Sequence, residues 1–124
     1  MGQFAQGADH LREALRIDPA QPAALESLAW LYATCPQGSV RDGSEAVRLA
    51  QQLCELTEND PSALDTLAAA YAEAGQFERA VAVAQQAVSA AVQRGQSELA
   101  RAFEARRRLY RARQPFREHS PLGR

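Results

Sequence analysis

The eight residues LESLAWLY at positions 25–32 return as LDTLAAAY at positions 64–71, and this pair of segments decides the fold. Both segments place leucine, leucine, alanine and tyrosine at positions i, i+3, i+4 and i+7. This spacing aligns the four side chains along one stripe of an α-helix, where they form its buried face. The copies are 39 residues apart, so the sequence predicts two equivalent amphipathic helices within an internal repeat.

A second stripe, built mainly from small residues, follows each of these segments. Its first copy consists of Ala46, Ala50, Leu53 and Cys54, and its second of Ala80, Ala84, Ala87 and Val88. These copies are 34 residues apart, five fewer than the first pair of segments. The first hairpin must therefore contain an insertion. The stretch CPQGSVRDG at 35–43 is rich in helix breakers, which predicts a long inter-helix loop there.

A partial copy opens the chain, and local signals delimit the helices. The triplet GQF occurs at 2–4 and again at 75–77. Asp60 followed by proline is typical of a helix start, and Asp42 with Glu45 three residues later resembles a capping box. We expect six helices, followed by an irregular tail at 114–124. The helices are expected at about 4–17, 22–35, 44–57, 61–74, 77–93 and 96–113.

This pattern resembles the tetratricopeptide repeat, a 34-residue helix-turn-helix unit with the signature W-x2-L-G-x2-Y, then A-x3-F, then P. Leu25 and Leu64 stand at the Trp position, Ala29 and Ala68 at the Gly position, and the tyrosines at the Tyr position. The resemblance, to the bacterial type of array, implies an all-α fold of antiparallel hairpins stacked as a short superhelix. It divides residues 1–113 into a half repeat (2–20), a repeat with the inserted loop 35–43 (22–60), a second repeat (61–94) and a capping helix (96–113).

The two ends of the array differ in character. The last predicted helix keeps an apolar face and turns its arginines away from it, as a terminal cap should. The apolar residues are Leu99, Phe103, Leu109 and Tyr110, and the outward residues are Arg101, Arg107, Arg108 and Arg111. The leading half repeat lacks its first helix. We therefore expect a C-terminal fragment of a longer protein, or else an apolar patch of Phe4, Leu11, Leu15 and Trp30 that a homodimer covers.

Composition argues against an enzyme. The chain has 124 residues and a net charge of −1, with only two histidines, His10 and His119, and two cysteines, Cys35 and Cys54. These offer neither metal-ligand spacing nor a catalytic triad, so we expect no metal, no cofactor and buried free thiols. The longest apolar runs are six residues, so no membrane span or signal peptide is expected, and a cytoplasmic location is the default.

In the family that this chain resembles, the inner helices line a concave groove for a peptide or partner protein. A projection of each inner helix down its axis shows which residues lie to the side of the core stripe and so face that groove. They are Glu26, Trp30, Ala33, Asp65, Ala69 and Ala72, with Glu73 at the edge. Lysine, arginine and asparagine, with which one branch clamps a peptide carboxylate, are missing from those positions. A basic ligand is therefore expected. Trp30 is either a peptide anchor or a cover for the exposed edge of the core.

Two other functions stay open. Residues 1–98 carry a net charge of −7 and residues 99–124 one of +6, so the last helix could bind an anionic surface or nucleic acid. Its arginines are Arg101, Arg107, Arg108, Arg111 and Arg113. Nucleic acid is the weaker choice for two reasons. The net charge of the whole chain is not basic, and Glu104 is placed to form ordinary helix pairs with Arg107 and Arg108. The array could also be an accessory segment of a larger membrane-anchored enzyme.

Arg106 breaks the pattern of the last helix, because its spacing from Leu99 and Phe103 puts it on the apolar face. An unpaired buried cation is costly, so we expect an ion pair with a carboxylate on the helix at 61–74. Asp65 and Glu73 are the candidates, and Glu73 is the preferred one. The alternative is that Arg106 reaches water at the helix edge.

Overall fold

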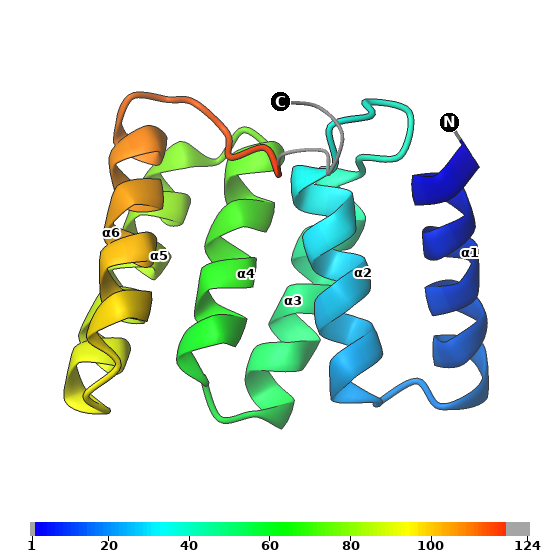
Figure 1. The fold of residues 1–124 in the computed structure, drawn as a ribbon, viewed down its shortest axis with the longest axis horizontal. Coiled ribbons are helices and arrows are strands. Elements are labelled where there is room, and N and C mark those ends of the chain that lie inside the picture. Colours follow the sequence, from blue (N-terminus) through cyan, green and yellow to red (C-terminus); the bar gives the residue numbers. More distant parts are fainter. Residues whose placement is uncertain (1, 119–124) are drawn as a thin grey trace.

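The structure, a computed structural model, describes residues 2–118, and within them it contains six α-helices and no strand (Figure 1). The helices lie within two residues of the predicted bounds, so the all-α fold and its helix order are confirmed. They are α1 (Gly2–Ile17), α2 (Pro22–Thr34), α3 (Gly43–Leu56), α4 (Pro61–Glu73), α5 (Phe77–Gln93) and α6 (Ser97–Arg111).

The helices run alternately up and down and stack side by side as an α-helical solenoid (Figure 1). Helix α2 packs against α1, α3 and α4, while α5 packs against α4 and α6. Helices α2, α4 and α6 lie on one side and run in the same direction, with α3 and α5 behind them. We call α2, α4 and α6 the inner helices, and their shared direction places their N-terminal halves at one end of the molecule.

The repeated stripes form the core. Leu25, Leu28, Ala29 and Tyr32 are buried, and so are their counterparts Leu64, Leu67, Ala68 and Tyr71. The alanines of the second stripes, at 46, 50, 80, 84 and 87, are at most 1% exposed. Because an alanine side chain is only a methyl group, these positions let neighbouring helices approach closely. The alanine-rich composition is therefore a packing feature as well as a source of helix propensity.

The expected helix caps are present, but the capping box is only half formed, because the Glu45 carboxylate binds Arg48 and the Asp42 N–H donates to the Tyr32 carbonyl. The Asp42 carboxylate accepts a hydrogen bond from the Glu45 backbone N–H at 3.2 Å, and the Asp60 carboxylate accepts one from Ser62 at 3.1 Å. These bonds satisfy backbone donors that the first turn of a helix leaves free. Gly75 and Gly95 follow α4 and α5 with φ of +81° and +71°, a conformation that glycine adopts without steric cost.

The inserted loop, residues 35–42, folds back on the end of α2. The Asp42 N–H donates to the Tyr32 carbonyl at 2.9 Å, and the Arg41 guanidinium donates to the Cys35 carbonyl at 2.6 Å. The next residue, Gly43, lies against the end of α4, where an added Cβ would lie 2.8 Å from the Ala74 nitrogen. The loop is therefore held on α2 and meets α4 at a position that has room only for glycine.

Both cysteines are free and buried, as the sequence predicted. Burial, with a smaller contribution from the negative charge of Asp60, raises the pKa of the Cys54 thiol to about 11. A thiol with so high a pKa stays protonated at neutral pH and is a poor nucleophile.

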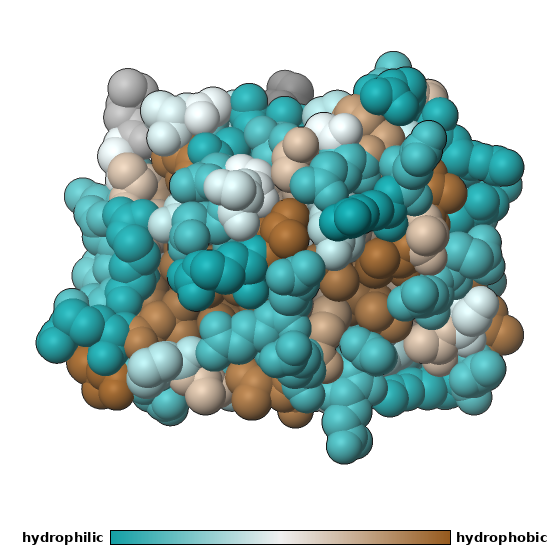
Figure 2. Space-filling model, turned by 180° about the vertical axis from the view of Figure 1, so that it is seen from behind, coloured by the Kyte–Doolittle hydropathy of each residue, from teal (hydrophilic) through white to brown (hydrophobic). Residues whose placement is uncertain are grey.

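The outer face, on which α3 and α5 lie, carries apolar areas broken up by polar side chains (Figure 2). Large exposed apolar residues are scattered along the described chain rather than gathered, and they are Ile17, Leu56, Val92 and Leu99. None of the helices between residues 2 and 118 has the length and apolar character needed to cross a bilayer.

Candidate ligand-binding groove

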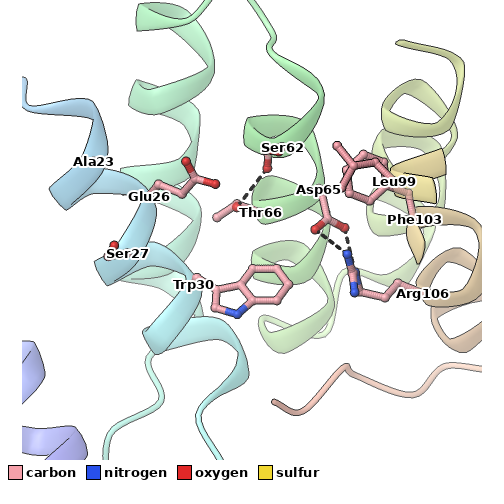
Figure 3. Close-up of a pocket in the computed structure, with 10 residues that line it drawn as sticks. All are labelled: Ala23, Glu26, Ser27, Trp30, Ser62, Asp65, Thr66, Leu99, Phe103 and Arg106. Atoms are coloured by element: carbon pink, nitrogen blue, oxygen red, sulfur yellow. Dashed lines mark hydrogen bonds and ion pairs between the residues drawn. The ribbon is translucent and has the colours of Figure 1, made fainter. Parts of the chain in front are cut away.

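A pocket of about 460 Å³ opens between the N-terminal and central parts of the three inner helices (Figure 3). We call it the open end of the groove. Helix α2 contributes one wall, α4 the floor and α6 the opposite wall. Its lining residues are Ala23, Glu26, Ser27, Trp30, Ser62, Asp65, Thr66, Leu99, Phe103 and Arg106. Three of the predicted groove residues, Glu26, Trp30 and Asp65, are therefore brought together as expected.

Glu26 projects into this pocket from α2 and is partly buried. No arginine within residues 2–118 lies at ion-pair distance from its carboxylate. Burial raises the pKa of Glu26, and the negative charges of Asp60 and Asp65 raise it further. The pocket therefore holds a carboxylate in an environment that a bound cation would relieve.

Asp65 and Arg106 form the ion pair that crosses the groove. The guanidinium Nε and Nη2 donate to the two carboxylate oxygens, each at 2.9 Å, and the side chains are only 18% and 9% exposed for Arg106 and Asp65. Parallel donation of this kind is the strong, geometrically specific form of an arginine–carboxylate contact. Burial nonetheless raises the pKa of Asp65, because the loss of water outweighs the opposing effect of Arg106.

This pair corrects one prediction and excludes its alternative. Glu73 was the preferred partner of Arg106, but the partner is Asp65, so the guanidinium is paired and its side chain is only 18% exposed. Glu73 lies eight residues beyond Asp65, about 12 Å further along α4 at 1.5 Å per residue. The inner helices run in the same direction, so the middle of α6 faces Asp65 rather than the end of α4.

Arg106 also lies against three aromatic rings. Its guanidinium carbon is 5.4 Å from the centre of the Trp30 ring, 5.6 Å from Phe103 and 5.0 Å from Phe116. A cation within about 6 Å of a ring face is attracted by the π electrons. Arg106 therefore joins the open end of the groove to the segment that contains Phe116.

That segment, residues 114–118, is irregular, as predicted, but it packs against the inner helices. The Phe116 and Trp30 ring centres are 5.7 Å apart, and the Trp30 indole N–H donates to the Glu118 carboxylate at 2.9 Å. The Glu118 backbone N–H donates to the Thr34 carbonyl at 2.8 Å. Figure 1 shows the segment running from the end of α6 past the end of α4 towards α2. It covers what we call the closed end of the groove. The remainder of the predicted tail, including His119, lies outside the described residues.

Glu73 belongs to the closed end. Its carboxylate has Arg117 at 2.7 Å and Arg41 at 3.4 Å, although neither guanidinium aims an N–H at it in hydrogen-bond alignment. The C-terminal segment and the inserted loop thus share Glu73 as a counterion.

The predicted alanine walls of the groove are wrong. Ala33, Ala69 and Ala72 are 1%, 1% and 2% exposed and cannot contact a ligand. All three belong to the hydrophobic core that the packed helices form, although a single-helix projection leaves these positions on the surface. The patch expected near the N-terminus also needs correction, because Trp30 contacts Phe116 and Arg106, whereas Leu11 and Leu15 pack against the core elsewhere.

Sequence reasoning missed part of the pocket. Leu99 was placed on the buried face of its helix, but it is 38% exposed and lines the pocket with Phe103. Hydroxyls of Ser62 and Thr66 contribute polar lining, and Thr66 donates to the Ser62 carbonyl at 3.0 Å. The signal for the closed end was Phe116, the one phenylalanine, tyrosine or tryptophan in the predicted tail at 114–124, directly after a proline.

Several arginines of α6 and of the residues that follow it already have partners. Glu104 forms ion pairs with Arg107 at 2.6 Å and Arg108 at 3.5 Å, and Arg113 lies 5.2 Å from the centre of the Phe77 ring. Within residues 2–118, no three His, Cys, Asp or Glu side chains form a cluster suited to a metal ion. Comparisons with protein-family models, curated proteins and solved structures found no match for this chain.

Proposed function

We propose that this chain is a non-catalytic protein-interaction module of the tetratricopeptide kind, which binds a basic peptide or protein segment at the open end of its groove. The observation that carries the proposal is the Glu26 carboxylate, which lies in a pocket without a cationic partner among residues 2–118. A lysine or arginine side chain of the partner would supply that charge.

The lining of the pocket suits such a side chain along its length. Glu26 offers the charge, and Trp30 and Leu99 offer apolar surface for the methylene stem. The pocket volume falls within the range of about 300 to 1,000 Å³ that is usual for ligand sites. Asp65 is neutralised by Arg106, so Glu26 is the carboxylate left to select the ligand.

The same groups support binding rather than catalysis. A general acid–base pair needs two groups that can exchange protons with a substrate. Here Asp65 is held by Arg106, and the lining residues include no histidine or cysteine. Glu26 is thereby left without a catalytic partner in the pocket.

A peptide array followed by calorimetry tests the proposal. The array should vary the position of lysine and arginine in peptides of otherwise small apolar residues, and the best hit should be titrated into the native chain. We expect Glu26→Gln to weaken binding by about tenfold or more, as loss of a charge-assisted contact does. Glu55→Gln, which removes an exposed carboxylate on α3, should leave affinity unchanged. Equal affinity of the native protein and Glu26→Gln would show that the groove is not the site.

Binding to an anionic surface through α6 gains no support from the contacts there, because Glu104 pairs with Arg107 and Arg108, and Arg113, just after the helix, lies over the Phe77 ring. The same calorimetry with a short RNA provides the comparison. Tight RNA binding that weakens steeply with salt, and that Arg101→Glu with Arg111→Glu abolishes, would favour the surface over the groove.

A further inference from the structure

The closed end of the groove contains a peptide bound to protein, and the peptide is part of the same chain. Residues 114–118 adopt no helix and lie across the inner helices. Phe116 is partly buried against the core, with Trp30 on one side and Arg106 on another. The segment therefore sits in the groove as a ligand would.

Its contacts are of the kinds that peptide recognition uses. Phe116 is the side-chain anchor between Trp30 and Arg106. Glu118 makes a main-chain hydrogen bond to α2 through the Thr34 carbonyl, which fixes the direction of the segment. Arg117 places its positive charge on Glu73. An aromatic residue followed by a basic one thus meets a complementary site.

Two residues are shared between the closed end and the open end. Trp30 and Arg106 line the pocket that contains Glu26, and both also contact Phe116. In Figure 3 they lie between Glu26 and the segment that crosses the lower right of the view. The two ends are therefore neighbouring parts of one surface.

We infer that the closed end is a second ligand subsite, selective for an aromatic residue followed by a basic residue, and that residues 114–118 occupy it as an intramolecular competitor. This inference rests on the proposed function, because it adds a subsite to the same groove. A partner that places a basic residue at Glu26 and an aromatic–basic pair at the closed end displaces the segment.

The need for both subsites follows from tethering. Residue 116 is five residues beyond the end of α6, so the segment is present at an effective concentration of about millimolar or higher. A free aromatic–basic peptide must overcome that local concentration. A partner that also gains the Glu26 contact does so more readily, so the segment makes the groove selective for ligands that satisfy both subsites.

The test uses a peptide of residues 114–118, acetyl-QPFRE-amide, titrated into the full chain. Trp30 is the only tryptophan, so its fluorescence reports a phenyl ring arriving beside it. We expect the peptide to bind Phe116→Ser, in which the subsite is vacated, at least about tenfold more tightly than the native chain. A QPSRE peptide should bind neither protein.

Phe4→Ser is the matched control, because it removes a partly buried phenylalanine from α1 and leaves Phe116 in place. It should behave as the native chain does. If Phe116→Ser does not fold, judged by circular dichroism, Arg117→Ala with Glu118→Ala loosens the segment instead and should bind QPFRE more tightly than the native chain. Equal affinity for native and loosened proteins, or no binding to either, would overturn the inference.

The experiments distinguish a failure of the basic-ligand proposal at Glu26 from a failure of the second subsite at the closed end. If a lysine peptide binds in a Glu26-dependent way but QPFRE does not bind the loosened chain, the open end is a ligand site and the second subsite is wrong. If QPFRE binds the loosened chain while Glu26→Gln changes nothing for lysine peptides, the closed end is a subsite and the basic-ligand proposal fails.

Discussion

The open and closed ends of the groove are built from the same three helices, yet only one of them is accessible. Ala23 near the start of α2 is exposed and lines the pocket, whereas Ala33 near its end is buried. The residue type and the helix are the same, but Ala33 belongs to the hydrophobic core, at the end of α2 where the Glu118 N–H donates to the Thr34 carbonyl. Accessibility in this groove therefore depends on the packing around each position as well as on the helix face.

The Arg106–Asp65 pair lies at the boundary between the two ends, and breaking it should have the largest effect on the free energy of unfolding. We expect Asp65→Ala to lower the free energy of unfolding by about 3 kcal/mol, because it leaves a largely buried guanidinium without its carboxylate. Urea denaturation of Asp65→Ala, Arg106→Ala and the double variant measures the coupling. If the double variant lost as much stability as the two single variants together, the two side chains would not be coupled, and the pair would not join α4 to α6. Arg108→Ala, whose side chain is 77% exposed, should change stability by less than about 0.5 kcal/mol.

The closed end also depends on the contact between Gly43 and the end of α4. We expect Gly43→Ala to cost about 2 kcal/mol, since the new methyl group would lie 2.8 Å from the backbone nitrogen of Ala74 and force the helices apart. Gly7→Ala on α1 is the control, because its added Cβ meets nothing within 4 Å. That variant should gain about 0.5 to 1 kcal/mol from helix propensity, so the two substitutions should have opposite signs in thermal denaturation.

Tyr110 lies close enough to the Arg106–Asp65 pair for the charges of both residues to act on it. We expect its substitution to change the free energy of unfolding by less than the substitutions of Asp65 and Gly43. The side chain is fully buried, its hydroxyl has no hydrogen-bond partner among residues 2–118, and burial raises its pKa strongly. We expect Tyr110→Phe to gain about 1 kcal/mol, because it removes an unsatisfied buried polar group without changing the ring. A loss of stability in urea denaturation would reveal a partner for the hydroxyl, such as an ordered water.

The smallest effect is expected at the open end, where Glu26 should make stability depend on pH. Its raised pKa means that the folded chain binds the proton more tightly than the unfolded chain does. The stabilisation that protonated Glu26 contributes to the folded chain is therefore fully present below about pH 4.5. It is lost as the pH rises through the pKa of Glu26 in the folded chain. Glu26→Gln should melt at the same temperature as the native protein near pH 3.5 and at a higher temperature at pH 7.

Glu45 provides the control of opposite sign. Its hydrogen bonds to Arg48 lower its pKa, so the folded chain favours the charged form. Glu45→Gln should therefore melt at a lower temperature than the native protein at pH 7, and the difference should disappear at low pH. If both variants shifted in the same direction, the pH dependence would not come from these carboxylates.

The fold could be predicted from the sequence because its determinants are local and repeated. The stripe that begins at Leu25 and its copy at Leu64 fix two helices, and their unequal spacing from the second stripes locates the inserted loop. Caps at Asp42 and Asp60 then set two of the helix starts. Each signal lies within one or two helical turns of the structure that it specifies.

The groove could be predicted only in part, because its shape depends on how helices lie relative to one another. Glu26, Trp30 and Asp65 were found from their angular position on a helix. The same method failed for Ala33 and Leu99, whose exposure depends on how the neighbouring helices pack. The partner of Arg106 required the relative height of α4 and α6, which no periodicity within either helix contains.

Glu73 has a further consequence, because two cations share its single negative charge. Arg41 of the inserted loop and Arg117 of the C-terminal segment approach the same carboxylate and repel each other. The two segments are thus rivals for one counterion, and their attachments are anticooperative. If Arg117 left, Arg41 would no longer share this negative charge, and we expect Glu73 to hold the inserted loop more firmly. Departure of the C-terminal segment would thus strengthen the attachment of the inserted loop through electrostatics alone, with no helix needing to move.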